Sequence, residues 1–163
     1  MLKKNKLGFG TCQLGGVNKI GSRHIGMGSQ KKRDSIEALN LAFENGVIFY
    51  DTADIYGNGK SEKLLGEVFK KKKKVIICSK IGNEIKKNRK IFNFSKNYVL
   101  KKLIGILRRL KRKKLDILLV HSPPSDFTLE NDKIRFVKYL KKKGLIRNFG
   151  ISFSTIAHAK KIL

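Results

Sequence analysis

The chain has 163 residues, of which 38 are Lys or Arg and 12 are Asp or Glu, giving a formal net charge of +26, and 40% of its residues are hydrophobic. This length and apolar content are those of one soluble globular domain, so we expect a single domain over residues 1–163. No apolar run approaches the about 20 residues that span a bilayer, and the basic N-terminus lacks the apolar stretch of a secretory signal. The sequence therefore predicts a cytoplasmic protein without a membrane partner.

The strongly positive charge has two interpretations. A field of this sign attracts polyanions such as nucleic acid. However, 30 of the 38 basic residues are Lys, and runs such as 70–74 and 141–143 fall where predicted helices end, a position that favours cations. These runs contain no interleaved aromatic residues of the kind that stack on bases. We therefore expect no specific nucleic-acid partner.

The first predicted elements are a short strand, a glycine-rich loop and a helix. Residues 7–12 are typical of a strand that leads into the loop, because no helix tolerates so many glycines. The helix is predicted to start at Asp34, where Glu37 completes the spacing of a capping box, and to end before Gly46.

Four further strands are predicted by short apolar runs at 47–50, 75–78, 115–120 and 145–151. Helical stripes separate these runs, and serines are predicted to cap the third and fifth helices, at Ser95 and Ser154. Five strands that alternate with helices indicate repeated βα units around a parallel sheet. Both a doubly wound sheet and a (β/α)8 barrel fit this α/β alternation.

Polar residues follow three of the predicted strands. Asp51, Lys80 and His121 come at or just beyond consecutive strand ends, and Tyr56 lies in the loop after Asp51. In both candidate architectures functional sites gather at the carboxyl ends of parallel strands. We therefore expect these four side chains to lie together.

These residue types suit proton transfer to an oxygen atom. The Tyr56 phenol has an ordinary pKa of about 10, and a nearby Lys80 ammonium would lower that pKa by favouring the phenolate. Asp51 would hold the ammonium in place. His121 would orient a substrate carbonyl by hydrogen bonding.

The sequence resembles the aldo-keto reductase family in four motifs, which occur in the family's order and spacing: FYDTADIYGNGKSEKLLGEVF (49–69), VIICSKIG (75–82), LDILLVHSPP (115–124) and KGLIRNFGIS (143–152). The resemblance implies a (β/α)8 barrel that binds NADPH, or less often NADH, and reduces a small carbonyl substrate. It also implies that Tyr56 donates the proton, that Lys80 and Asp51 tune the acidity of Tyr56, and that His121 orients the carbonyl.

The resemblance implies a cofactor site as well. Ser152 matches a residue that contacts the nicotinamide amide, although the Asn that commonly follows it is Phe153 here. Asp51, Gly10 and Thr11 match other cofactor-facing positions. Gly59, Lys60 and Ser61 look like the end of a phosphate-binding P-loop. However, that motif needs a glycine at position 54, which is Asp54 here, so we expect no P-loop.

The length predicts an incomplete barrel. A full barrel needs about 250 residues and builds its phosphate site from the loops after its last two strands. We therefore expect about five βα units, no phosphate-binding half, and doubtful activity of this chain alone. Two open barrel edges would favour self-association or pairing with a separate C-terminal half. The alternative function is thus a non-catalytic fragment that acts as a basic binding scaffold or pairs with such a half.

Metal and disulfide sites are not expected. His24, His121 and His158 are far apart in the sequence and lack a second ligand at metal-binding spacing, and His158 is predicted to lie on a helix surface. Cys12 and Cys78 occur in apolar strand-like segments, which favours buried, reduced thiols.

Overall fold

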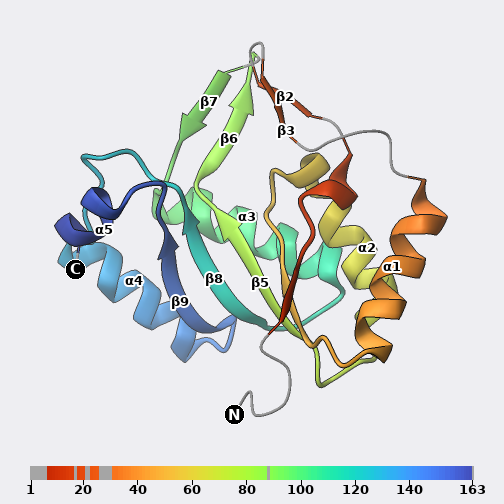
Figure 1. Ribbon diagram of the computed structural model, residues 1–163. Helices are drawn as coiled ribbons and strands as arrows, with labels where there is room; N and C mark the ends of the chain where they lie inside the picture. Colours follow the sequence, from red (N-terminus) through yellow and green to blue (C-terminus); the bar gives the residue numbers. More distant parts are fainter. Residues whose placement is uncertain (1–6, 17, 21–22, 26–30, 88, 163) are drawn as a thin grey trace.

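The computed structural model describes residues 7–16, 18–20, 23–25, 31–87 and 89–162. Its centre is a parallel sheet of five strands (Figure 1), which follow one another across the sheet in chain order: β1 (Gly8–Gly10), β4 (Phe49–Asp51), β5 (Ile76–Ile81), β8 (Leu115–His121) and β9 (Ile146–Ser152). A doubly wound sheet would reverse its strand order at a switch point. The unbroken order therefore selects the barrel from the two predicted architectures.

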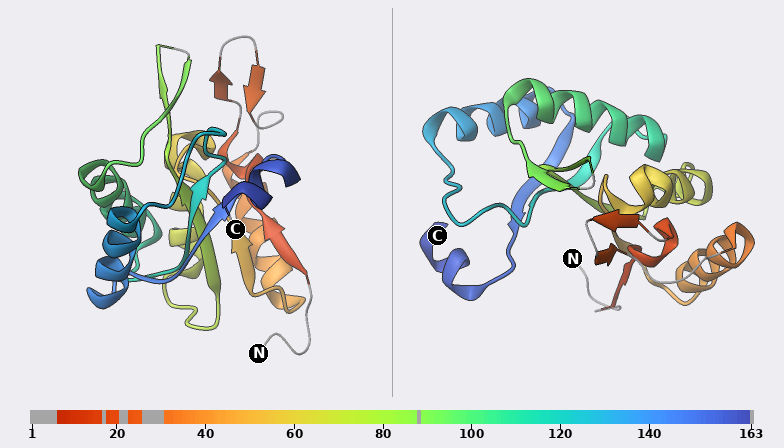
Figure 2. Two further views of the ribbon diagram at one scale, coloured as in Figure 1. Left: turned by 90° about the vertical axis from the view of Figure 1, so that its left-hand side faces the viewer. Right: turned by 90° about the horizontal axis from the view of Figure 1, so that it is seen from above.

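The helices between these strands form a layer outside the sheet. Seen from above, the first four follow one another in an arc along one side of the strands (Figure 2). The five helices are α1 (Lys32–Glu44), α2 (Lys60–Phe69), α3 (Lys96–Leu110), α4 (Asn131–Lys142) and α5 (Ile156–Ile162). Among the described residues, no helix has the length and apolar character needed to cross a membrane.

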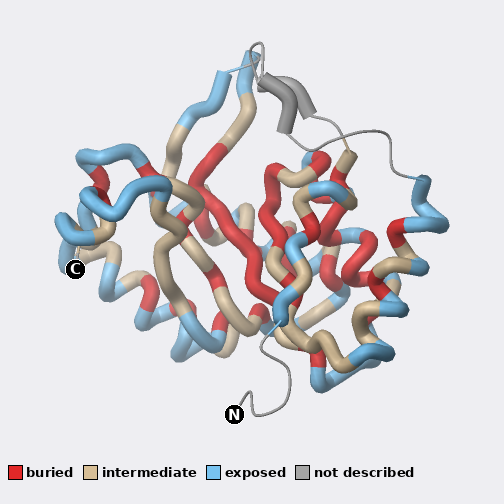
Figure 3. Tube along the Cα trace, in the orientation of Figure 1, coloured by how far each residue is buried: buried red, intermediate tan, exposed pale blue. Residues whose placement is uncertain are grey.

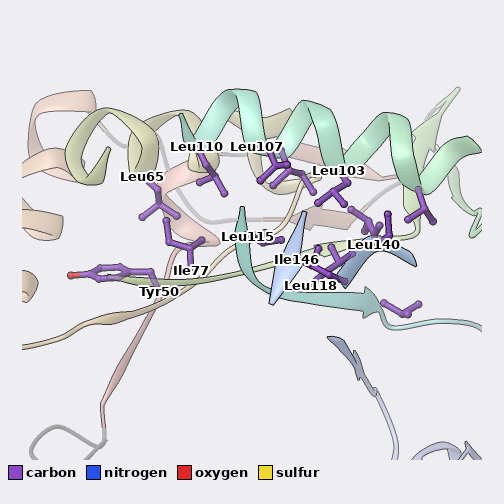
Figure 4. Close-up of a cluster of buried hydrophobic side chains, with 14 of the residues drawn as sticks. Tyr50, Leu65, Ile77, Leu103, Leu107, Leu110, Leu115, Leu118, Leu140 and Ile146 are labelled. Carbon is purple, nitrogen blue, oxygen red and sulfur yellow. The ribbon is translucent and has the colours of Figure 1, made fainter. Parts of the chain in front are cut away.

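The hydrophobic core lies between the sheet and this helical layer. Figure 3 shows the buried residues concentrated along the strands and on the helix surfaces that face them. Tyr50 and Ile77 of the sheet meet the apolar stripes of the helices, where Leu65, Leu103 and other leucines are fully buried (Figure 4). Burying a side chain of this size contributes about 1.5–3 kcal/mol, so the core fixes each helix against its strand.

Two hairpins and two 3-10 turns were not predicted from the sequence. β2 (Asn18–Ile20) pairs with β3 (Arg23–Ile25), and β6 (Asn83–Lys86) pairs with β7 (Arg89–Phe92), both antiparallel. The hairpins extend beyond the upper end of the sheet in Figure 1. The β6–β7 segment is rich in lysine and lacks clear apolar alternation, so its pattern gives little strand signal. The turns are η1 (Gln13–Gly15) and η2 (Tyr56–Gly59).

Two predicted helix starts are wrong. α1 begins at Lys32, and its N-cap residue is Lys31, which makes no side-chain capping bond, so the capping box at Asp34 does not exist. In α5 the hydroxyl of Thr155 accepts a hydrogen bond from the backbone N–H of His158 at 3.2 Å. Thr155 directly precedes the helix and therefore replaces Ser154 as the cap.

Helix ends were predicted more accurately. α1 is followed by Gly46 at φ 86°, and α4 is followed by Gly144 at φ 70°, both in the left-handed conformation that ends helices. Ser95 occupies the N-cap position of α3 as expected, without a side-chain capping bond. These residues set the points at which the chain turns back toward the sheet.

Candidate active site

The four predicted proton-transfer residues lie at the carboxyl end of the sheet. Asp51 is the last residue of β4, His121 is the last of β8, and Lys80 is one residue from the end of β5. Tyr56 begins the η2 turn that follows β4. Parallel pairing of β4 with β5 and of β5 with β8 brings the three strand ends to one edge, as the sequence predicted.

The Lys80 ammonium joins two of these residues. It forms a salt bridge with the Asp51 carboxylate and donates a 3.0 Å hydrogen bond to the backbone carbonyl of Thr52. It also lies 3.5 Å from the Tyr56 hydroxyl. Lys80 is only 6% exposed, so these contacts replace water around its charge.

His121 completes the group and packs against the Tyr56 ring. The two rings meet edge to face with their centroids 5.9 Å apart. The backbone carbonyl of His121 accepts a 2.6 Å hydrogen bond from the side-chain amide of Asn83, which follows β5. All four predicted residues are therefore brought together around Tyr56 and Lys80.

The electrostatics of Tyr56 differ from the expectation. Burial raises the pKa of the Tyr56 phenol, and this effect outweighs the Lys80 ammonium, which acts in the predicted, lowering direction. The sequence could not show how far the ring is desolvated. Tyr56 is therefore protonated at neutral pH, and Lys80 limits the cost of losing that proton.

His121 is neutral at physiological pH. Burial and the nearby ammonium groups of Lys80 and Lys90 lower its pKa to about 4. A neutral imidazole has one N–H donor, so it can orient an oxygen without competing with Tyr56 as an acid. Its Nδ1 and the Oδ1 of Asn83 are buried without hydrogen-bond partners among the described residues.

Three hydrogen-bonded, buried hydroxyl groups fix the ends of the loop that carries Tyr56. The Ser61 hydroxyl contacts the hydroxyls of Thr11 and Thr52 at 2.7 and 2.9 Å. Thr11 in turn donates to the backbone carbonyl of Asp51 at 2.8 Å. These bonds tie the ends of β1 and β4 to the start of α2, so the loop is anchored where it leaves the sheet and where it enters the helix.

Two glycines hold the middle of the same loop against η1. A Cβ on Gly57, which has φ 58°, would collide with the backbone of Gly15, and a Cβ on Gly15 would lie 2.5 Å from the Gly57 nitrogen. The two backbones are thus in direct contact beside Tyr56. Only glycine at both positions permits this approach.

A buried ion pair supports the loop from the helical layer. Glu62 is fully buried, accepts a 2.6 Å bond from the Ser79 hydroxyl and forms a 2.6 Å salt bridge with Arg109 of α3. Burial raises the pKa of Glu62, and Arg109 counteracts this shift. The sequence analysis missed the pair. The available signal was that Glu62 precedes Leu65 and Phe69 at helical spacing, on the apolar stripe of α2.

Asp54 is a second buried carboxylate that sequence analysis did not assign. It is 5% exposed, and neither of its oxygens has a hydrogen-bond partner among the described residues. The Lys102 ammonium lies 3.7 Å away. Burial raises the pKa of Asp54 to about 7, while Lys102 acts in the opposite direction. Its backbone N–H donates to the carbonyl of Lys80 at 3.2 Å, which links the loop to β5.

The predicted cofactor-facing residues lie on both sides of this group. Gly10 pairs with Asp51, and a Cβ built on it would meet nothing within 4 Å. Ser152 ends β9 beside His121 and is half-buried. The hydroxyl of Thr11 is buried and takes part in the anchoring bonds described above, so a cofactor contact at Thr11 stays a prediction.

The remaining histidines and cysteines add no further site. His158 is buried, with its ring 5.5 Å from Phe153, so its predicted surface position is wrong because α5 places it against that ring. The side chain of His24 lies outside the described residues. Cys12 and Cys78 are free thiols, and burial raises the pKa of Cys78 to about 12. The described residues contain no cluster of three His, Cys, Asp or Glu side chains able to hold a metal ion.

Comparison with known proteins gives a consistent result. Residues 6–163 match the sequence model of the Aldo/keto reductase family. Aldo-keto reductase YhdN of Bacillus subtilis is 27% identical over 154 residues, which are 93% of this chain and 44% of that protein. The curated relatives are thus about twice as long as this chain.

Solved structures agree with the fold. The holo form of aldo-keto reductase AKR11C1 from Bacillus halodurans superposes with a TM-score of 0.79 at 26% identity, over 95% of this chain and 48% of that one. The putative aldo-keto reductase PA4992 from Pseudomonas aeruginosa gives a TM-score of 0.77 at 28% identity, over 96% and 58%. The predicted barrel class with about five βα units is therefore confirmed.

Substituting Gly57 by Ala tests the contact between the loop and η1. Gly57→Ala should destabilise the protein by about 3 kcal/mol, because the new Cβ meets the Gly15 backbone in addition to the strain of a positive φ. Gly144→Ala is the control, since Gly144 also has a positive φ (70°) but nothing within 4 Å of an added Cβ, and should cost only about 1 kcal/mol. Urea unfolding measures both; equal losses would contradict the backbone contact.

Removing the Arg109 charge tests the buried ion pair. Arg109→Met should destabilise the protein by about 3–5 kcal/mol, because Glu62 would be left buried without its partner. The double variant Glu62→Gln with Arg109→Met should recover part of this loss. Arg108→Met removes a neighbouring, exposed arginine of α3 and should change the free energy of unfolding by less than about 0.5 kcal/mol. An equally large effect of Arg108→Met would show that the loss of any arginine of α3 destabilises the protein, and it would contradict a specific role for the Glu62–Arg109 ion pair.

The raised pKa of Asp54 predicts a pH-dependent stability difference. Because the folded pKa (about 7) exceeds the unfolded value of about 3.9, Asp54 favours the folded state at low pH, and this contribution is lost as pH rises through 7. The stability of Asp54→Asn relative to the unsubstituted protein should therefore increase between pH 4 and pH 7.5, by up to about 4 kcal/mol. Urea unfolding across this range measures it, and a flat difference would contradict the burial effect. In a Lys102→Met background the pH range over which this stability difference rises should extend to higher pH, because the charge that lowers the pKa of Asp54 is removed.

Proposed function

Because the chain belongs to the Aldo/keto reductase family, we propose that it contributes to NAD(P)H-dependent reduction of a small aldehyde or ketone, with Tyr56 as the proton donor. The observation that carries this proposal is the Lys80 ammonium, which contacts the Asp51 carboxylate and lies 3.5 Å from the Tyr56 hydroxyl. A buried positive charge at that distance favours the phenolate that forms when Tyr56 gives up its proton.

Each residue of the group has a distinct part in this proposal. Tyr56 holds its proton at neutral pH and releases it to the carbonyl oxygen as negative charge develops there. Lys80 stabilises the resulting phenolate, and Asp51 keeps the ammonium in position. The neutral His121 donates its single N–H to the same oxygen, which fixes the carbonyl beside Tyr56.

The residues around the group fit a nicotinamide cofactor. Open space at Gly10, which pairs with Asp51, and the half-buried Ser152, which pairs with His121, leave room and a polar group on the two sides of the site. Gly10, Asp51 and Ser152 would hold the nicotinamide end, and Thr11 would position Asp51 from below. The reduced cofactor would supply hydride to the carbonyl carbon. The absence of a phosphate-binding half and the preference for NADPH over NADH stay predictions.

Replacing the Tyr56 hydroxyl tests this function. With NADPH and an aromatic aldehyde, Tyr56→Phe should lower turnover by about 10²–10⁴-fold, the range for loss of a general acid. Tyr139→Phe changes an exposed tyrosine of α4 and serves as the control, with unchanged turnover. Absorbance of the reduced cofactor measures both. Turnover that survives in Tyr56→Phe would exclude the proposed proton donor.

The alternative function rests on the edges of the sheet. Among the described residues β1 pairs only with β4, and β9 only with β8, so each outer strand has one free edge. If this chain alone shows no turnover, the alternative function applies. We propose that a C-terminal barrel half, or a second copy of this chain, then pairs with these edges. Analytical ultracentrifugation shows whether this chain binds a second copy of itself or a C-terminal half. A chain that stays monomeric on its own and forms no complex with such a half would contradict this alternative.

A further inference from the structure

Three unbroken runs of basic residues lie at the end of the sheet opposite the candidate active site. The runs are 70–74, 111–114 and 141–143, and all 12 of their residues are Lys or Arg. They lie between α2 and β5, between α3 and β8, and at the end of α4 before β9. Because these strands are parallel, the three connections come together at the amino ends of the strands, on the lower side of Figure 1. We call this surface the basic face.

The basic face is exposed and continuous across neighbouring strands. Eleven of the 12 residues are exposed, and the half-buried Arg112 is the exception. None of the three runs contains an acidic residue. The surface therefore presents a concentrated positive charge to solvent.

Arg112 fixes the runs relative to one another. Its guanidinium donates to the carbonyl of Val75 at 3.0 Å and to the carboxylate of Asp116 at 2.8 Å. Asp116 also accepts a 3.0 Å bond from the backbone N–H of Ile77. On the other side the backbone N–H of Leu115 donates to the carbonyl of Leu145 at 2.9 Å. The three runs thus form one preorganised surface.

Helix capping accounts for Lys141 and Lys142, which lie in the last turn of α4, but not for the runs 70–74 and 111–114. A helix C-terminus carries the equivalent of about half a negative charge, which one or two cations in its last turn satisfy. α3 already has Arg108 and Arg109 in its last turn before the run 111–114 begins. Each further like charge adds repulsion that destabilises the folded state. An anionic partner would relieve this repulsion.

We propose that the basic face binds the phosphate backbone of double-stranded nucleic acid without sequence preference. Its free cations are lysines, which act as point charges, whereas Arg112 is occupied within the protein. The runs contain no aromatic side chain for base stacking and no amide for reading base edges. Backbone charge neutralisation supplies essentially all of the affinity in non-specific binding of this kind.

A membrane surface fits the basic face less well. Stable membrane attachment takes a second, apolar signal in addition to a polybasic patch. Of the apolar residues that follow the runs, Val75 and Leu115 are at most 1% exposed and Leu145 is half-buried. The runs themselves offer no apolar side chain for insertion. Anionic vesicles are therefore the comparison that the experiment must include.

The experiment measures fluorescence anisotropy of a labelled duplex of about 20 base pairs from about 50 to about 200 mM KCl. One variant changes Lys70, Lys71 and Lys74 to Gln, leaving Lys72, which lies over the Phe43 ring. The matched control changes three lysines of the β6–β7 hairpin at the opposite end to Gln: Lys86, Lys87 and Lys90. Both variants lose the same charge.

The two variants should behave differently. The first should bind at least about tenfold more weakly at low salt, and its plot of log affinity against log salt should be flatter by about 2–3, as expected for three lost phosphate contacts. The hairpin variant should change affinity by less than about threefold. A triple variant of Lys141, Lys142 and Lys143 should repeat the first result, and circular dichroism shows whether each protein is folded.

Three results would overturn the proposal. The unsubstituted protein would fail to bind the duplex at about 50 mM KCl, or the hairpin variant would weaken binding as much as the variant of Lys70, Lys71 and Lys74, which would reveal a net-charge effect only. Tighter, run-dependent binding to vesicles of anionic phospholipid would assign the face to a membrane. None of these measurements depends on reductase activity, so the proposal stands or falls separately from the proposed function.

Discussion

The buried Lys80 ammonium is the constraint on which the candidate site depends. A charge that is 6% exposed must be compensated inside the protein, because removing it from water costs several kcal/mol. Its partners, the Asp51 carboxylate and the Thr52 carbonyl, both come from the neighbouring strand and the loop that follows it. The pairing of β4 with β5 therefore determines the charge balance of the site, and Tyr56 is brought within reach because its loop starts at the same carboxylate.

The helical layer gives this loop its fixed shape. The loop has contacts on three sides: the hydroxyl cluster of Ser61, the backbone of Gly15 and the Glu62–Arg109 pair. Each contact joins segments that are far apart in the sequence. The proposed role of Tyr56 as a proton donor requires its hydroxyl to be held within a few tenths of an ångström, and this needs support from outside its own strand. The position of Tyr56 is thus a property of the whole β/α arc.

Sequence reasoning found the parts of the site that follow from strand ends. Asp51, Lys80 and His121 were predictable because parallel strands place their carboxyl ends together, and Tyr56 because it lies in the loop that starts at Asp51. The Glu62–Arg109 pair was not predictable, since it links residues 47 positions apart that no local pattern connects. The direction of the Tyr56 pKa shift was missed for a related reason: burial is a property of the packed structure, whereas the neighbouring lysine could be inferred from the sequence. The β6–β7 hairpin was missed because ladder bonds, rather than apolar alternation, define it.

The two ends of the sheet are electrostatically separate. Strands such as β8, with seven residues, span about 23 Å at about 3.3 Å per residue. At physiological ionic strength the Debye length is about 8 Å, so exposed lysines of the basic face contribute little to the potential at Tyr56. The charges that act on His121 are instead those of Lys80 and Lys90. The lysines of the basic face can therefore bind a partner at one end of the sheet with little effect on the electrostatics of the candidate site at the other.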